Sequence, residues 1–349
     1  MNKILTIVVP TYNMENYLRK CLDSLVISAN MMLVLEVLVI NDGSKDSSST
    51  IAHEYESKYP QTFRVIDKDN GNYGSCVNRG VKEAKGKYIK VLDADDRFDR
   101  KVFEGYLQFL LEYDVDLVLS DFCEIDEDGI IRKMVSYKLP TDHSFSLGDL
   151  PKNFNLWMHA VTYRTENLKE INYYQTEGIS YTDLEWIYLP MTTVKSGMYF
   201  HKPLYLYLVG REGQTMNPFT YARNINQNLI IFHRMMNQYD ELYDSASREV
   251  KYFLDERMKK RASVIYRAFL FKYPSVLSIK DLQTVDDEIR TKHPSIYSIT
   301  NEVNDLRIIP GIRYHYISDW RNDNSCLDSF KYKLLRTWKK FIGRPLRVI

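Results

Sequence analysis

The sequence IKVLDADDRF, residues 89–98, carries an apolar run directly into a cluster of carboxylates. Asp93, Asp95 and Asp96 lie within four positions, separated only by Ala94. Like charges this close repel one another, so the cluster needs a cation, a hydrogen-bond network or full solvation. If the strand geometry continues, Asp93 and Asp95 share a face and lie about 7 Å apart along the chain. Two carboxylates so placed suit a hard divalent ion, Mg²⁺ or Mn²⁺, of the kind that bridges to phosphate oxygens.

This run is the last of four apolar, strand-like runs in the first hundred residues, and segments with helical spacing of apolar residues separate them. The four runs are ILTIVV (4–9), LVLEVLVI (33–40), TFRVID (62–67) and YIKVL (88–92). Strands that alternate with helices predict an α/β fold with a mostly parallel sheet flanked by helices. Further strands are expected at 116–122 and 198–209, and the patterns after 218 are mainly helical. We therefore expect three regions: 1–110, 111–217 and a helical C-terminal region, 218–349.

Composition limits the class of protein. The chain has 349 residues, 44% hydrophobic and 27% charged, which is the balance of a soluble globular protein. Its four cysteines are widely spaced, which argues for reduced thiols in the cytoplasm and against a disulfide framework or a zinc site. The N-terminal apolar run is too short for a signal peptide, and no run reaches the roughly 18 apolar residues of a membrane span.

Polar clusters follow three of the expected strands. They are Thr11-Tyr12-Asn13, Asn41-Asp42-Gly43-Ser44 and the Asp93–Asp96 cluster. Any one of them could be an ordinary polar turn, since turns favour these residue types. In a parallel α/β sheet, however, ligands bind beyond the carboxyl ends of the strands. Three such clusters on one edge therefore predict a binding site for a phosphate-containing ligand.

These residues carry a resemblance to a known family. VVPTYNMENYLRKCLDSL, VLVINDGSKDSS and DNGNYGSCVNRGVKEAKGKYIKVLDADD, in this order and spacing, resemble the nucleotide-binding half of family-2 glycosyltransferases. The resemblance is dense over residues 4–100 and looser to about 217. It implies the GT-A fold and sugar transfer, mostly with inversion, from a nucleotide-diphosphate sugar.

The resemblance also implies roles for individual residues. Tyr12 would lie against the nucleotide base, and Asp42 would accept the N3–H of a uracil-type base. Asp93 would contact the ribose or the water shell of the metal, and Asp95 would be the direct ligand of Mn²⁺ or Mg²⁺. The donor-binding set carried over from the family is completed by Pro10, Thr11, Asn13, Lys68, Asn72, Ala94 and Arg211.

Inverting transfer also needs a base, because the acceptor hydroxyl must lose its proton as it attacks. Family members place an Asp, or a Glu-Asp pair, before an aromatic helix, and GISYTDLEWIYLP (178–190) matches that place. We expect Asp183 to be the base, with Glu185 as the second choice. Asp183 is also well suited to cap the helix that follows, and the two roles are compatible.

Three further features are open. Many family members have Arg at the position of Val77, so the phosphate-facing cation must come from elsewhere, for example Lys68 or Arg79. Arg211, Gln214 and Thr215 could close over the diphosphate or the acceptor, or they could form an ordinary surface loop. His159 could line the acceptor pocket or ligate the metal, but a lone His in an aromatic segment is more often packed and hydrogen-bonded.

Other classes of protein fit the sequence less well. A dehydrogenase is disfavoured because no G-x-G-x-x-G follows the first strand. A sugar nucleotidylyltransferase would need a Gly- and Arg-rich loop where PTYNMEN stands. An inert nucleotide-sugar or glycan-binding scaffold would not need the complete set of carboxylates. The expected acceptor is the hydroxyl of a glycan or a lipid-linked glycan in bacterial surface polysaccharide synthesis, and the oligomeric state is left open.

The C-terminal segment 331–349 holds seven Lys or Arg and no acid, whereas the rest of the chain carries a net charge of about −6. Leu334, Trp338 and Phe341 recur at helical spacing beside basic positions, as in an interfacial helix, although a helix packed on the domain has the same pattern. No recognisable nucleic-acid fold accompanies it, so nucleic acid is not an expected partner. The expected partner of this basic segment is an anionic membrane surface.

If residues 330–349 bind the inner face of the plasma membrane, deleting them should release the protein from anionic vesicles, because about 1 kcal/mol per basic residue near the surface is lost. Co-sedimentation with phosphatidylserine-containing liposomes measures this. Equal recovery of the full and shortened chains in the pellet would contradict the membrane role.

Overall fold

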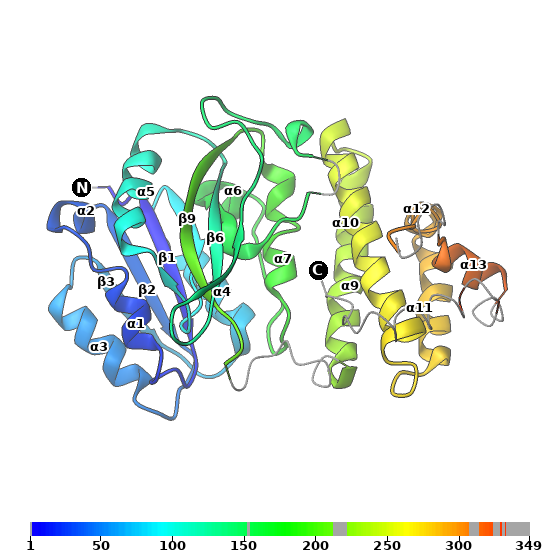
Figure 1. The fold of residues 1–349 in the computed structure, drawn as a ribbon, viewed down its shortest axis with the longest axis horizontal. Helices are drawn as coiled ribbons and strands as arrows, with labels where there is room; N and C mark the ends of the chain where they lie inside the picture. The colour runs from blue at the N-terminus through cyan, green and yellow to red at the C-terminus, as the bar shows by residue number, and fades with distance from the viewer. Residues whose placement is uncertain are drawn as a thin grey trace. The chain divides into compact units, whose positions relative to one another are not determined.

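The computed structural model describes residues 2–151, 154–211, 222–306 and 314–323, together with Ser329 and Tyr332. The chain divides into two compact units, Met1–Thr215 and Met216–Ile349 (Figure 1). None of the described helices is both long and apolar enough to cross a membrane. The expected basic tail lies outside the described residues, apart from Tyr332, and so do Gln214 and Thr215.

The first unit is built on one sheet of nine strands. In the order β3-β2-β1-β4-β8-β6-β9-β5, with β7 paired to β6, neighbouring strands are hydrogen-bonded. The strands are β1 (Leu5–Thr11), β2 (Leu35–Asn41), β3 (Phe63–Asp67), β4 (Tyr88–Val91), β5 (Arg97–Phe98), β6 (Leu117–Ile125), β7 (Ile131–Val135), β8 (Val161–Arg164) and β9 (Gly197–Leu208).

The expected fold class, an α/β sheet flanked by helices, is confirmed. Strands β3, β2, β1 and β4 are all parallel, as the alternation of strands and helices predicted. In the other half of the sheet β8 is antiparallel to both β4 and β6, while β9 runs parallel to β6 and antiparallel to β5. The parallel register sets Val8 opposite Val91 and Thr11 opposite Asn41, so the ends of β1, β2 and β4 lie at one edge.

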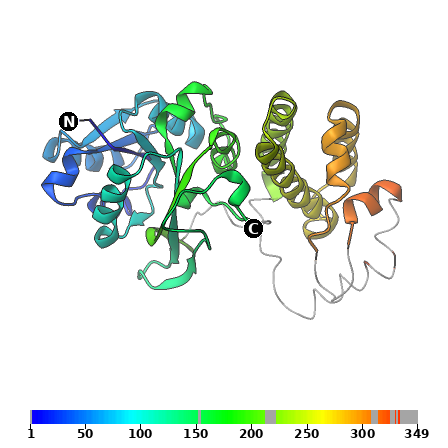
Figure 2. The same cartoon turned by 90° about the horizontal axis from the view of Figure 1, so that it is seen from above.

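Helices in the connections between the strands pack against the sheet (Figures 1 and 2). Helix α4 packs on β1 and β2, α3 packs on β2 and β3, and α5 packs on β9. Asp99 caps the start of α5, because its carboxylate accepts the Lys101 amide at 2.9 Å. The helices of this unit are α1 (Leu18–Asp23), α2 (Ala29–Leu33), α3 (Ser48–Lys58), α4 (Asn72–Glu83), α5 (Arg100–Glu112), α6 (Thr165–Glu170) and α7 (Asp183–Trp186), with short 3₁₀ turns η1 (Leu147–Asp149), η2 (Met158–Ala160) and η3 (Pro190–Thr193).

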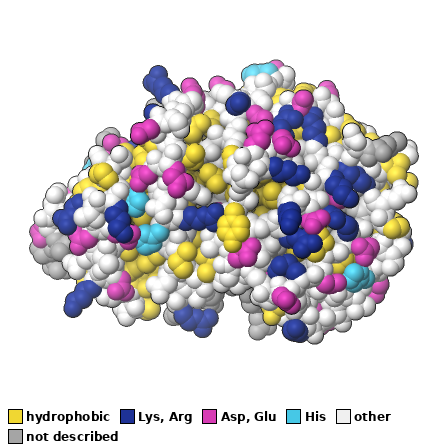
Figure 3. All heavy atoms as spheres, turned by 180° about the vertical axis from the view of Figure 1, so that it is seen from behind, with side chains coloured by type: hydrophobic (Ala, Val, Ile, Leu, Met, Phe, Trp, Pro, Cys, Tyr) yellow, Lys and Arg dark blue, Asp and Glu magenta, His cyan; other side chains and the backbone are white. Residues whose placement is uncertain are grey.

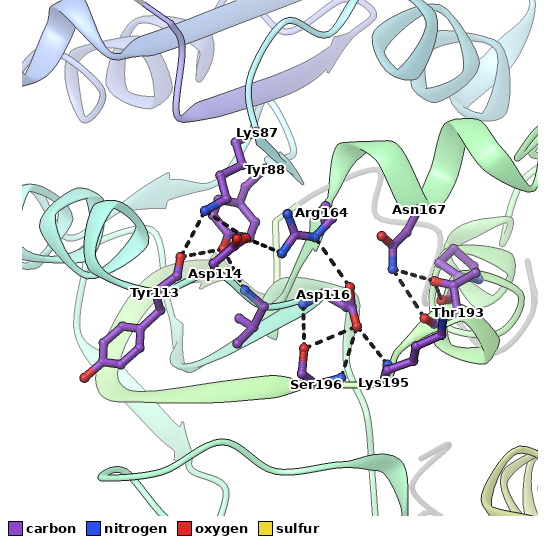
Figure 4. A network of polar contacts seen from close by, with 12 residues as sticks. Lys87, Tyr88, Tyr113, Asp114, Asp116, Arg164, Asn167, Thr193, Lys195 and Ser196 are labelled. Atoms are coloured by element: carbon purple, nitrogen blue, oxygen red, sulfur yellow. Dashed lines mark hydrogen bonds and ion pairs between the residues drawn. The ribbon is translucent and has the colours of Figure 1, made fainter.

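A polar network joins the residues just before β6 to the segment that leads into β9 (Figure 4). Asp116 accepts the backbone amides of Lys195 at 2.9 Å and Ser196 at 3.1 Å. Arg164, at the end of β8, pairs with Asp114 and Asp116. The network satisfies backbone donors that strand pairing leaves free, and so fixes the start of β9.

The segment 173–178 is held tightly against α4. Asn78 bonds both the amide of Gln175 (2.7 Å) and its carbonyl (2.8 Å), as a neighbouring strand would. The amide of Gly178 donates to the carbonyl of Gly71 at 2.9 Å. Gly74 permits this close approach, since a Cβ there would lie 2.0 Å from the Thr176 carbonyl oxygen. The segment leads directly into α7, so this docking positions the first turn of that helix.

The second unit is helical. Its described helices are α9 (Ile225–Tyr243), α10 (Arg248–Arg267), the π-helical turn η4 (Ala268–Lys272), α11 (Ile279–Lys292), α12 (Pro294–Thr300) and α13 (Tyr316–Asn322). Helix α10 packs on α9 and α12. The side chain of Arg321 is only 3% exposed; it donates to Asp286 at 2.7 Å and lies over the Tyr297 ring at 3.8 Å. This buried pair joins α13 to α11 and α12.

The surface carries both signs of charge. On the face shown in Figure 3, Lys and Arg side chains are interspersed with Asp and Glu. This distribution agrees with the chain's formal net charge of +1.

We predict that Gly74→Ala destabilises the protein by roughly 1–3 kcal/mol, because the added methyl group pushes the 173–178 segment away from α4. Gly105→Ala in α5 is the matched control: a Cβ there meets nothing within 4 Å, so it should stabilise by about 0.5–1 kcal/mol. Chemical denaturation of both variants measures this. Equal stability of the two would show that the close approach does not constrain the fold.

Candidate active site

The first two strand-end clusters are joined by hydrogen bonds. The Asp42 amide donates to the Thr11 carbonyl at 2.8 Å, and the Lys45 amide donates to the Asn13 side chain at 2.8 Å. Asn13 has a positive φ of 52°, a conformation that Asn tolerates better than most residues. Pro10 and Thr11 are buried at the end of β1, whereas Tyr12 is 46% exposed. The turn thus leaves an aromatic face accessible beside Asp42.

Asp42 is buried and accepts several donors. Its carboxylate is paired with the Lys68 ammonium and accepts the Gly71 amide at 2.9 Å. Lys68 also donates to Ser75 at 2.8 Å, so its position is fixed by three acceptors that include the Asp69 carbonyl. Lys68 therefore lies with Asp42, among the residues expected to face the base. Asn72 begins α4 beside them, exposed and with φ of 69°.

Asp93 follows β4 and is held by two tyrosines. The Tyr73 hydroxyl donates to its carboxylate at 2.9 Å, and its amide donates to the Tyr205 hydroxyl at 3.1 Å. Burial, followed by the charge of Asp95, raises the pKa of Asp93 to about 7, and the charge of Asp183 contributes in the same direction. The charge of Asp183 thus acts on Asp93, although 90 positions separate them in the sequence.

Asp96 has a structural part to play. It is 2% exposed, and it accepts the Tyr205 hydroxyl at 2.6 Å and the Leu208 amide at 2.7 Å. These bonds attach the loop after β4 to the end of β9. Burial raises the pKa of Asp96 well above its usual range, and the charges of Asp95 and Asp93 add to this. Ala94, between the carboxylates, is buried as well.

Asp95 is paired with a cation from the end of β9. The Arg211 Nε atom lies 2.5 Å from its carboxylate, and the guanidinium lies over the Tyr17 ring at 5.4 Å. Arg79, the other cation considered for the phosphates, pairs instead with Glu83 on its own helix at 3.0 Å. Among the three candidate cations Lys68, Arg79 and Arg211, only Arg211 lies at the Asp93–Asp95 end of the site.

The two candidate bases, Asp183 and Glu185, both lie in α7 but have different surroundings. Asp183 is the first residue of α7, and its charge raises the pKa values of Tyr73 and Tyr207, after the larger effect of burial on both. Glu185 is 2% exposed and clamps Thr176, accepting its amide and its hydroxyl at 2.8 Å each. Glu185 thus closes the loop that precedes Asp183, and the charge of Asp183 adds to the rise in the pKa of Asp93.

His159 lies in a buried aromatic cluster. Its ring stacks on Tyr207 with centroids 4.3 Å apart and meets Tyr205 edge-on at 4.8 Å. Burial and the charge of Lys90 lower its pKa to about 3. Lys90 is fully buried and donates to the carbonyls of His159 and Val161. The packed arrangement expected for His159 is present, but its Nδ1 has no hydrogen-bond partner among the described residues.

Several residues that shape the site escaped sequence reasoning. Tyr73 and Tyr205 both bond Asp93, and Gln175 bonds Thr182 at 2.9 Å, directly before Asp183. Tyr73 could have been predicted from the sequence, because it lies next to Asn72 in the Gly- and Asn-rich stretch. Tyr205 alternates with other aromatics on a long strand, where nothing in the sequence marks one hydroxyl as special.

Comparisons with known proteins agree with this geometry. Residues 6–171 match the model of the family "Glycosyl transferase family 2". An uncharacterized glycosyltransferase of Mycoplasma genitalium, MG025, is 30% identical over 227 residues, which are 61% of this chain and 70% of that protein. The minor teichoic acid biosynthesis protein GgaB of Bacillus subtilis is 35% identical over 115 residues, 32% of this chain and 13% of that protein.

Solved structures show the same fold. Residues 1–349 of S. aureus TarS superpose with a TM-score of 0.66 at 18% identity, over 99% of this chain and 93% of that one. The complex of that protein with UDP-GlcNAc gives a TM-score of 0.63 at 20% identity and the same coverage. From its sequence relatives and its family match, this chain belongs to glycosyltransferase family 2.

Proposed function

We propose that the protein transfers a sugar from a UDP-sugar to a hydroxyl of a glycan or lipid-linked acceptor, with inversion and with a divalent cation. The observation that carries the proposal is the electrostatic interaction between Asp183 and Asp93. One carboxylate from the start of α7 lies within electrostatic range of the strand-end carboxylates that the donor diphosphate would approach. A base on the acceptor side and a cluster for the leaving group on the other side are what a one-step displacement requires.

The donor half of the site supports a nucleotide. Tyr12 offers an exposed ring for stacking, and the Asp42 carboxylate, in the neighbouring turn, is held by Lys68 and the Gly71 amide. The TarS structures contain UDP or UDP-GlcNAc in a protein of the same fold. A UDP-sugar is therefore the donor class we propose for this chain, with Asp42 toward the base and Asp93 toward the ribose and diphosphate.

The residues fit a divalent cation. Asp93 and Asp95 provide carboxylate oxygens, which suit Mn²⁺ or Mg²⁺, and their mutual repulsion is relieved by positive charge. When bound, such an ion would stabilise the negative charge of the departing nucleoside diphosphate. Asp95, with Asp93, would hold it. Arg211 forms an ion pair with Asp95. Of the three candidate cations it is therefore the one that could turn toward the diphosphate.

In the proposed reaction Asp183 accepts the proton of the acceptor hydroxyl while that oxygen attacks the anomeric carbon, and the bond from this carbon to the diphosphate breaks, so that UDP leaves. The clamp of Glu185 on Thr176 and the bond from Gln175 to Thr182 fix the turn that carries Asp183. The place of action we propose is the cytoplasm, in surface polysaccharide synthesis. The teichoic acid relative and the buried, unpaired thiols of Cys21, Cys76 and Cys123 support this.

Asp183→Asn should lower the rate of sugar transfer at least about 100-fold, because the base is removed, and should leave UDP binding within about twofold. Asp95→Asn should instead weaken cation-dependent UDP binding as well as transfer. Release of UDP in the presence of an acceptor measures the first effect, and calorimetry measures the second.

The matched control is Asp99→Asn, which changes only the cap of α5 and should leave both properties near those of the wild type. Near-normal transfer by Asp183→Asn would show that the base lies elsewhere. Loss of UDP binding in the same variant would show that Asp183 belongs to the donor half of the site.

A further inference from the structure

A row of three aromatic rings has no part in the proposed donor site. His159 stacks on Tyr207 with centroids 4.3 Å apart and planes inclined by 28°. The Trp157 ring lies 6.3 Å from the His159 ring, and their planes are inclined by 31°. Phe122, which is fully buried, packs against Trp157 at 5.8 Å and against His159 at 5.2 Å. Trp157 and Tyr207 are partly exposed, so the two outer rings of the row present surface to solvent.

An ion pair adjoins this row of rings. Glu124 on β6 lies opposite both Tyr207 on β9 and Lys133 on β7, so the three side chains project from one face of the sheet. The Lys133 ammonium lies 2.8 Å from the Glu124 carboxylate and 5.6 Å from the centroid of the Trp157 ring. The side chain of Lys133 is 40% exposed and that of Glu124 is 23% exposed. We call the surface formed by Glu124, Lys133, Trp157, His159 and Tyr207 the aromatic shelf.

The aromatic shelf begins beside the proposed reaction centre. Burial raises the pKa of the Tyr207 hydroxyl, and the charges of the three carboxylates after β4 and of Asp183 add to this. Tyr207 is thus within electrostatic range of both the carboxylate cluster and the proposed base. The shelf continues across β9, β6 and β7, whereas the proposed donor half lies at the ends of β1, β2 and β4. It therefore lies on the acceptor side of the site.

We infer that the aromatic shelf binds a neutral pyranose ring of the acceptor. The inference rests on the proposed function and deepens it by naming the chemical class of the acceptor. A pyranose ring has faces of C–H groups and an edge of hydroxyl groups. Aromatic rings can cover the apolar face, while the hydroxyl groups at the edge need hydrogen-bond donors and acceptors beside the rings. The aromatic shelf provides both.

The ion pair matches the hydroxyl edge of a sugar. A carboxylate only accepts hydrogen bonds and an ammonium only donates them, so Glu124 and Lys133 can serve two neighbouring hydroxyl groups. A partly exposed ion pair contributes little to stability, so a change of partners on binding costs little. The two charges of the pair cancel, so the shelf has no excess positive charge for a phosphodiester, which the Glu124 carboxylate would repel. The chemistry therefore favours a neutral sugar over a polyol phosphate.

The rings are held in place before any ligand binds. The ammonium of Lys90, which is buried, donates to the carbonyls of His159 at 2.7 Å and Val161 at 3.1 Å. These bonds fix the end of η2, which carries the middle ring of the row. A surface whose aromatic rings are already ordered loses little conformational entropy when a ligand binds.

The experiment is saturation-transfer NMR of the full chain with UDP in excess and with irradiation of the aromatic protons. The neutral probes are the methyl pyranosides of glucose, galactose, mannose, N-acetylglucosamine and N-acetylgalactosamine, and the charged probes are glycerol phosphate and ribitol phosphate. We expect saturation of the C–H protons on one face of at least one neutral sugar, and a weaker signal from both polyol phosphates. A signal from a polyol phosphate that equals or exceeds that of every neutral sugar would overturn the inference. So would the absence of a signal from all of the neutral sugars.

Variants assign the signal to the aromatic shelf. Trp157→Leu, which keeps apolar volume without a ring face, should raise the Kd of the best-binding neutral sugar at least about fivefold, and Trp157→Phe should keep it within about twofold of the wild type. Glu124→Gln, at a partly exposed position where folding is not at risk, should raise the same Kd about threefold, because a charged acceptor of hydrogen bonds is lost.

The matched control is Tyr59→Leu. Tyr59 is also partly exposed, with the Lys58 ammonium 5.2 Å from its ring centroid and the Phe63 ring at 5.8 Å, but it lies just before β3, at the opposite edge of the sheet. Sugar binding that is as tight in Trp157→Leu and Glu124→Gln as in Tyr59→Leu would overturn the inference. None of these readouts uses sugar transfer. Failure here would leave the role of Asp183 standing, and failure of the transfer experiments would leave the sugar-binding surface standing.

Discussion

The structure depends on the way in which the chain accommodates three carboxylates at the end of β4. Asp96 is buried and bonded to Tyr205 and Leu208, so its carboxyl group attaches the loop to β9. Asp93 is held between Tyr73 and Tyr205, and Asp95 is paired with Arg211. Each carboxylate thus has its own partner, and the partners come from α4, β9 and the residues just after β9. The cluster that we propose binds the donor also links the two halves of the sheet.

The second constraint is the docking of the 173–178 segment on α4. Asn78 pairs with both backbone groups of Gln175, and Gly74 lets the two backbones touch. Because α4 begins next to Gly71, which donates to Asp42, the same helix connects Asp42 with the segment that leads to Asp183. If these residues have the roles we propose, one rigid element positions both the donor half of the site and the catalytic base, which suits a reaction that requires in-line alignment.

The sequence predicted the parallel half of the fold well, because continuous apolar runs and helical spacing are local signals. Where the sequence-based prediction of the fold was wrong or incomplete, the cause can be named. The second strand was expected from residue 33, but Leu33 ends α2 and β2 begins at Leu35, since an apolar run alone does not separate a short helix from a strand. The antiparallel half of the sheet depends on long-range pairing, for which neither β6 nor β9 carries a signal.

The residues of the candidate site also divide into those that local sequence signals mark and those that only the folded structure reveals. Asp42, Asp93 and Asp95 could be picked out because strand ends and motif spacing mark them. The pairing of Lys68 with Asp42, and of Arg211 with Asp95, could not, because a sequence shows charges without showing which ones meet. His159 was expected to be packed and hydrogen-bonded. It is packed, but its Nδ1 has no hydrogen-bond partner in the described part of the chain, which only the positions of the neighbouring atoms can show.

The central claim is that the strand-end carboxylates bind a nucleotide diphosphate together with a divalent cation. Calorimetric titration of UDP into the protein, with Mn²⁺ and then with EDTA, tests it most directly. The account predicts micromolar binding with Mn²⁺, weakened at least about tenfold by EDTA, because the diphosphate then meets uncompensated carboxylates. Binding of UDP that is equally tight with EDTA, or absent under both conditions, would contradict it.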